Sequence, residues 1–150
     1  MKTINPQALT HLISRIYTSL GVSDDKASVL SDSLVMADLW GHSSHGVLRT
    51  TWYAERMQHH VIDIKTDPEI TTDTGPLLAI DGHNGIGQFI TRQAVGLAAD
   101  RARQYGISCV SIHRSGHFGT AMYFTRQLAE AGFTTLTNVT EGFEGRGNEN

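Results

Sequence analysis

Cysteine, basic residues and long apolar runs are all scarce in this sequence. Its 150 residues include one cysteine, Cys109, so no disulfide can form within the chain, and we expect a reducing compartment. Twelve basic residues against 15 acidic ones give a formal net charge of -3, which provides no broad positive surface for nucleic acid. No stretch approaches the roughly 20 apolar residues that cross a bilayer, and the N-terminus lacks a signal-peptide pattern. We therefore expect a cytoplasmic protein without a nucleic-acid or membrane partner.

Apolar residues recur at helical spacing in the first part of the chain. Asn5 can cap a first helix that Gly21 ends, and Ser23 can cap a second one. The apolar stripes of these helices are Leu9, Ile13, Ile16 and Leu20, then Ala27, Leu30, Leu34 and Ala37. A third helix is predicted from Ser43 to about Met57. Its expected buried residues are Val47, Leu48, Trp52 and Met57.

Strands alternate with helices in the rest of the chain. Two extended runs are predicted between Asp67 and Asp81, the second at Leu77–Ile80. The elements predicted after them are a helix at about Gln88–Tyr105, a strand at Ile107–Ile112, a helix at about Thr120–Ala131 and a strand at Phe133–Thr137. This alternation predicts a layered α/β fold.

The end of the sequence differs in composition from the rest. From Thr140 the chain is polar and glycine-rich, which favours a disordered tail. We therefore divide the chain into one domain at residues 1–138 and a divergent tail at residues 139–150. An α/β domain that ends just after a strand is predicted to be incomplete.

The segment Gly41–Arg49 holds the residues best suited to chemistry on an organic acid. If Ser44 begins a helix, His45 and Arg49 lie four residues apart on one face. Arginine presents a fork that matches a carboxylate, and histidine exchanges protons near neutral pH. Ser44 could orient the imidazole, and Gly46 leaves room for a substrate. The alternative is that His45 is a surface or capping histidine and Arg49 a solvated helix residue.

A second candidate segment, Arg114–Ala121, lies between a predicted strand and a predicted helix. Open α/β sheets bind ligands at such loops, and the free amides of a following helix suit a phosphate. Gly116 and Gly119 permit a close approach of the backbone. The segment lacks the dinucleotide glycine fingerprint and the lysine of phosphate-binding loops, so an ordinary strand-to-helix turn is the alternative.

Two further patterns are less specific. The glycine spacing in Asp81–Gln88 runs opposite to the dinucleotide fingerprint, so we interpret this segment as a turn that enters a helix. Eight histidines invite a metal site at His42 with His45, His59 with His60, or His113 with His117. None of these pairs belongs to a helical zinc motif with a catalytic Glu, so we predict no metal. A histidine-ligated metal hydrolase remains an alternative function.

The order of these segments resembles the N-terminal part of the malate/L-lactate dehydrogenase family. The resemblance rests on Ser44-His45-Gly46 with Arg49, then Asp81-Gly82 to Gly85-Ile86-Gly87-Gln88, then Ser115-Gly116-His117-Phe118-Gly119. It implies an NAD- or NADP-dependent oxidoreductase that interconverts a small 2-hydroxy acid of the malate or lactate type and its 2-oxo acid. It also implies a mixed α/β fold distinct from the doubly wound dinucleotide fold, and a homodimer.

The resemblance also assigns roles to single residues. It implies that His45 is the proton donor, that Ser44 assists it, and that Arg49 binds the substrate carboxylate. The residues that it places against the nicotinamide cofactor are His117, Phe118, Gly119, Thr120 and Ala121. In some relatives the histidine at the position of His117 is the catalytic base, so two histidines compete for the acid-base role.

The resemblance runs from about Leu9 to Asn138 and then ends. A Gly-Thr-Asn-Pro motif and an aspartate that works with the histidine follow in the family and have no counterpart here. The sequence therefore predicts a truncated product or a fragment. A non-catalytic remnant of such an enzyme is accordingly an alternative function.

Overall fold

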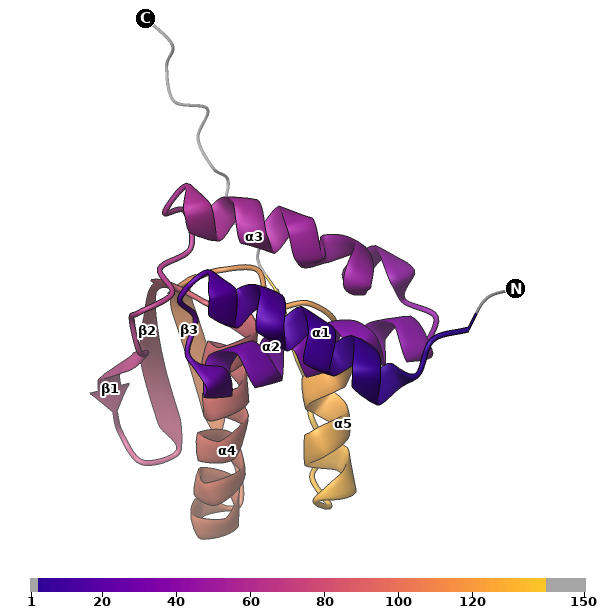
Figure 1. Ribbon diagram of the computed structural model, residues 1–150. Helices are drawn as coiled ribbons and strands as arrows, with labels where there is room; N and C mark the ends of the chain where they lie inside the picture. Colours follow the sequence, from indigo (N-terminus) through magenta and orange to yellow (C-terminus); the bar gives the residue numbers. More distant parts are fainter. Residues whose placement is uncertain (1–2, 140–150) are drawn as a thin grey trace, which may run out of the picture.

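The computed structural model describes residues 3–139, which begin with two helices packed against each other, α1 (Pro6–Ser19) and α2 (Asp24–Leu39) (Figure 1). The Asn5 side chain accepts a hydrogen bond from the Ala8 amide at 3.1 Å, as its capping role predicts. Both predicted helices are confirmed. The stripe expected in α1 is only partly right, because Tyr17 is buried whereas Ile16 is 38% exposed.

The third predicted helix begins later than the sequence suggested. Ser43–His45 and Val47–Arg49 form separate 3-10 turns, η1 and η2, and the α-helix α3 covers Thr50–Gln58. The cause is Asp38 at the end of α2, whose carboxylate accepts a hydrogen bond from the Val47 amide at 2.9 Å. This contact holds the chain outside helical geometry. As a result Leu48, which we expected to be buried, is 77% exposed.

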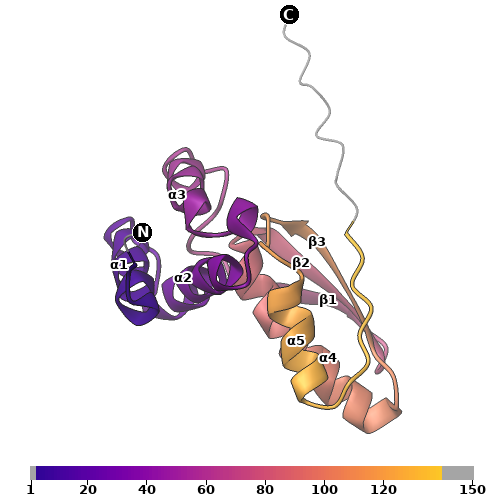
Figure 2. The same ribbon diagram turned by 90° about the vertical axis from the view of Figure 1, so that its right-hand side faces the viewer.

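A three-stranded sheet forms the second half of the fold, with the order β1-β2-β3. Its strands are β1 (Glu69–Asp73), β2 (Leu77–Gly85) and β3 (Cys109–Ser115). β1 and β2 are antiparallel, whereas β2 and β3 are parallel and are joined by the helix α4 (Gly87–Tyr105). α4 packs on one face of the sheet, and α5 (Met122–Glu130) lies beside α4 (Figure 2).

Three strand predictions need correction. β2 continues through Asp81–Gly85, which we interpreted as a turn, because a bulge with positive φ at His83 and Asn84 keeps the strand paired with β3. β3 begins two residues later than Ile107, which is 72% exposed. Phe133–Thr137 forms no strand, because it pairs with no other segment of the described residues and a strand needs a neighbour for its amides.

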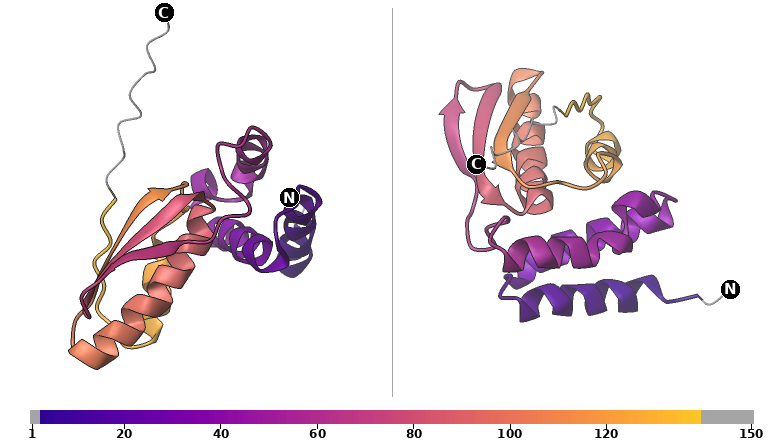
Figure 3. Two further views of the ribbon diagram at one scale, coloured as in Figure 1. Left: turned by 90° about the vertical axis from the view of Figure 1, so that its left-hand side faces the viewer. Right: turned by 90° about the horizontal axis from the view of Figure 1, so that it is seen from above.

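Two apolar clusters hold the described residues together. The first joins α1, α2 and α3, and the second lies between β2, β3 and α4. Figure 3 places α1, α2 and α3 on one side of the molecule and the sheet with α4 and α5 on the other. The predicted tail lies outside the described residues from position 140 onward. Within residues 3–139 no helix has the length and apolar character that a bilayer crossing requires.

Candidate functional site

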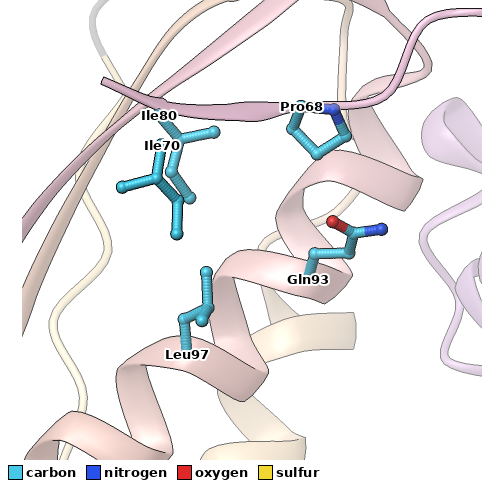
Figure 4. Close-up of a pocket in the computed structure, with 5 residues that line it drawn as sticks. All are labelled: Pro68, Ile70, Ile80, Gln93 and Leu97. Atoms are coloured by element: carbon cyan, nitrogen blue, oxygen red, sulfur yellow. The ribbon is translucent and has the colours of Figure 1, made fainter. Parts of the chain in front are cut away.

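A hollow between the sheet and α4 is lined by none of the predicted site residues (Figure 4). It is lined by Pro68, Ile70, Ile80, Gln93 and Leu97. None of these side chains is titratable, so the hollow offers no group for proton transfer. The residues with chemistry gather instead where η1, η2 and α3 meet the loop after β3.

The two histidines selected from the sequence lie against each other. The rings of His45 and His117 stack with 5.6 Å between their centroids and 28° between their planes. Trp52 of α3 meets His117 edge-on at 5.8 Å. The two candidate segments therefore form one site. The η turns supply His45 and the loop after β3 supplies His117.

Glycines bring the loop after β3 against the start of α4. A Cβ atom on Gly87 would lie 2.2 Å from the carbonyl oxygen of Gly116, a distance that no side chain tolerates. The Gly116 amide also donates to the Gly85 carbonyl at 3.1 Å. The segment Asp81–Gln88 is thus the surface on which the His117 loop rests, and it places the side chain of Gln88 beneath that loop.

A hydrogen-bonded chain leads from α4 to His117. The amide nitrogen of Gln88 donates to the Tyr53 hydroxyl at 2.6 Å, and that hydroxyl lies 2.6 Å from Nδ1 of His117. The backbone amide of Gly119 also donates to Nδ1, at 3.3 Å. Gln88 and Tyr53 are completely or almost completely buried, at 0% and 1% exposure. The exposed His117 side chain therefore has two buried side chains behind its Nδ1 atom.

Packing and nearby cations keep His117 neutral. Burial of one side of its imidazole lowers the pKa of His117, and the nearby His45, Arg49 and Arg56 lower it further. Burial also raises the pKa of the Tyr53 hydroxyl to about 12, with smaller opposing contributions from Gln88 and Arg49. At neutral pH the site therefore combines a neutral imidazole, a protonated phenol and positive guanidinium groups, which together favour an anionic ligand.

Arg49 reaches this site by a different route from the predicted one. Its Nε donates to the Ser44 carbonyl at 2.8 Å, and its guanidinium carbon lies 5.4 Å from the centroid of the Trp52 ring. The hydroxyl of Ser44 is 2.9 Å from Nδ1 of His45. His45 and Arg49 thus come together through two 3-10 turns and not on one face of an α-helix.

The remaining residues of the His117 loop occupy different environments. Phe118 packs on Phe124 of α5, with 5.8 Å between the ring centroids. Thr120 is buried and its hydroxyl lies 3.2 Å from Nδ1 of His42, while Ala121 immediately precedes α5. Gly119 adopts a φ of +83°, which favours glycine.

Sequence reasoning missed three members of this site. Tyr53 carried a signal, since it follows Arg49 by four residues, but the helix pattern gave it no role. Gln88 was noted as the end of a turn, the start of a helix and part of a family motif, and His42 as a candidate metal ligand, but neither was given a role beside His117. Within residues 3–139, no group of three or more His, Cys, Asp or Glu side chains is placed to hold a metal ion.

The sequence matches the family model described as malate/L-lactate dehydrogenase over residues 4–141. The chain belongs to the malate/L-lactate dehydrogenase family. Among curated members of this family, it is 35% identical over 122 residues to a malate/(S)-sulfolactate dehydrogenase of Methanothermus fervidus. It is also 35% identical over 136 residues to a ureidoglycolate dehydrogenase (NAD⁺) of Escherichia coli.

Solved structures of this family share the fold. The malate dehydrogenase of Pyrococcus horikoshii OT3 superimposes with a TM-score of 0.85 at 32% identity, over 87% of this chain and 38% of that one. The two curated relatives are matched over 81% and 89% of this chain, but over 36% and 38% of their own lengths. The chain thus has the mixed α/β fold of the family and spans little more than a third of these relatives.

Proposed function

We propose that this chain supplies the acid-binding and proton-transfer part of a nicotinamide-dependent 2-hydroxy acid dehydrogenase. The observation that carries the proposal is the stacking of His45 on His117 beside Arg49 and Trp52. The names of the relatives, which include malate, sulfolactate and ureidoglycolate dehydrogenases, support the same class of reaction. The homodimer implied by the resemblance stays a prediction.

In this proposal Arg49 binds the carboxylate of the acid. Ser44 already holds its Nε, so the guanidinium is oriented before a ligand arrives, and its terminal nitrogens are the ones offered to the carboxylate. His45 exchanges a proton with the oxygen on the second carbon of the acid. Its Nδ1 pairs with the Ser44 hydroxyl, which leaves Nε2 for that exchange.

The residues of the His117 loop fit a nicotinamide cofactor, NAD or NADP. The aromatic rings of His117 and Trp52 and the glycine backbone at Gly119 suit a planar ring, and the positive groups nearby suit its phosphates. When bound, the cofactor supplies or accepts the hydride. His117, Phe118 and Gly119 would hold it, with Thr120 and Ala121 contributing backbone, because the Thr120 hydroxyl already pairs with His42.

The proposed binding of the substrate carboxylate by Arg49, here called the Arg49 clamp, is tested with Arg49→Met. The substitution is made in a full-length member of the family that carries residues 4–138 of this chain. Losing hydrogen bonds to a charged group costs about 1.5–3 kcal/mol, so we expect the KM for a 2-oxo acid to rise roughly 10- to 150-fold. The KM for NADH or NADPH should not change. Arg103→Met, which alters an exposed arginine paired with Asp100, is the matched control. An unchanged KM for the acid would remove Arg49 from the clamp.

A further inference from the structure

We propose that the backbone amide of Gly119 and the side chain of Gln88, which acts through Tyr53, together fix the tautomer of His117, so that Nδ1 accepts hydrogen bonds and Nε2 carries the proton. Gln88 and Tyr53 are positioning residues in this inference, since both act on His117 from beneath it. One consequence of this inference, the assignment of different roles to His45 and His117, rests on the proposed function.

The backbone amide of Gly119 determines the direction of the hydrogen bonds. A backbone N–H can only donate, and this one points at Nδ1 of His117 from 3.3 Å. Nδ1 must therefore keep its lone pair. In a neutral imidazole the proton then lies on the other ring nitrogen, Nε2.

The direction of the remaining bonds follows from this one. Because Nδ1 has no hydrogen, the hydroxyl of Tyr53 at 2.6 Å must donate to it. The Tyr53 oxygen is then free to accept, and the amide nitrogen of Gln88 donates to it at 2.6 Å. Both side chains are buried, so water does not replace either partner.

The reverse direction conflicts with the same geometry. It would require the Gln88 amide to turn its oxygen toward Tyr53, and Nδ1 of His117 to donate to the Tyr53 oxygen. The Gly119 amide would then face an N–H group and lose its acceptor, which is costly for a backbone donor.

This arrangement separates the roles of the two histidines. The Nδ1 lone pair of His117 is shared by two donors, and the guanidinium groups of Arg49 and Arg56, together with the nearby His45, oppose an added proton. His117 therefore donates a hydrogen bond from Nε2 and does not serve as the base. The proton exchange of the proposed reaction belongs to His45.

The tautomer is measured directly on the intact, ¹⁵N-labelled chain. Long-range ¹H–¹⁵N correlation spectra distinguish a protonated from an unprotonated ring nitrogen. At neutral pH we expect His117 to show a protonated Nε2 and an unprotonated Nδ1. A proton on Nδ1 in the wild-type chain would overturn the proposal.

Gln88→Glu tests where the preference comes from. An ionised carboxylate accepts but does not donate, so at a pH above the pKa of the buried glutamate, which burial raises, the Tyr53 hydroxyl would turn toward it and Nδ1 of His117 would have to carry the proton. We expect the variant to show the opposite tautomer. Gln93→Glu, which places the same charge at an exposed position of α4, should show the wild-type pattern. A wild-type pattern in Gln88→Glu would exclude Gln88 as the source.

Tyr53→Phe provides a second test if the buried carboxylate prevents folding. Removing the hydroxyl leaves only the weaker Gly119 contact, so both tautomers should be populated and the nitrogen shifts should become intermediate. Unchanged ¹⁵N shifts of the His117 ring would overturn the proposal that Gln88 acts on His117 through Tyr53. These spectra require neither cofactor nor acid, so the relay and the Arg49 clamp can fail independently.

Discussion

Gly46 lies against the carboxylate of Asp38, at the point where the chain passes from α2 to the site. A Cβ atom at Gly46 would lie 2.1 Å from Oδ1 of Asp38, whose other carboxylate oxygen accepts the hydrogen bond of the Val47 amide. The sequence suggested that this glycine leaves room for a substrate. In the structure Asp38 occupies the space beside Gly46. The absence of a side chain at Gly46 therefore shapes the turn that carries His45.

Gly46→Ala should therefore destabilise the protein. Its φ of −91° is open to alanine, so the cost comes from displacing Asp38, and we expect about 1–3 kcal/mol less free energy of unfolding in urea. Gly96→Ala is the matched control, because no atom lies near its Cβ position in α4 and alanine favours helices by about 1 kcal/mol. Equal effects of the two substitutions would contradict this explanation.

At the scale of elements, an ion pair ties the middle of β2 to the end of β3. The guanidinium Nε of Arg114 donates to both carboxylate oxygens of buried Asp81, at 2.9 and 3.0 Å. The backbone amide of His83 donates to the same carboxylate at 2.9 Å. These contacts, with Arg114 first, hold the pKa of Asp81 well below its usual range.

Asp81→Asn should lower stability at neutral pH and reduce its loss in acid. A carboxylate whose folded pKa is depressed stabilises the fold above its ordinary pKa of 3.8, and this contribution is lost as the pH falls below that value. The difference in urea midpoint between wild type and variant should thus be smaller at about pH 3 than at about pH 6. Asp100→Asn, at an exposed i,i+3 pair, should show little difference at either pH. A difference in urea midpoint between wild type and Asp81→Asn that stays constant with pH would argue against the ion pair.

At the scale of the whole molecule, α4 links the two apolar clusters. Phe89 packs against the cluster of α1, α2 and α3, while the next residue, Ile90, belongs to the cluster beneath the sheet. α2 also contacts both α4 and α5. The helical part and the sheet therefore share one helix, and we expect them to unfold together.

Ile80→Ala tests this coupling. Ile80 is buried in the cluster beneath the sheet, so the cavity should cost about 2–5 kcal/mol. Trp40 and Trp52 lie in the helical part. The free energy of unfolding measured from their fluorescence should fall by the same amount as the value measured from far-ultraviolet circular dichroism. The exposed Ile107→Ala should change stability by about 0.5 kcal/mol or less. A fluorescence midpoint that stays at the wild-type value would show that the two parts unfold separately.

The sequence by itself determined the features that depend on near neighbours. Asn5 predicted the start of α1, the alternation after Pro68 predicted an α/β fold, and the spacing of short motifs singled out His45, Arg49 and His117. These signals act over a few residues, through caps, turns and the period of apolar side chains. The catalytic and binding roles of the three residues stay predictions.

Only the tertiary structure decided how these residues meet. The start of α3 depends on Asp38 across a turn, and the length of β2 depends on its pairing with β3. The environment of His117 depends on Tyr53 and Gln88, each more than 25 positions away in the sequence. Long-range contacts set burial and the direction of hydrogen bonds, and local patterns along the chain carry no record of them.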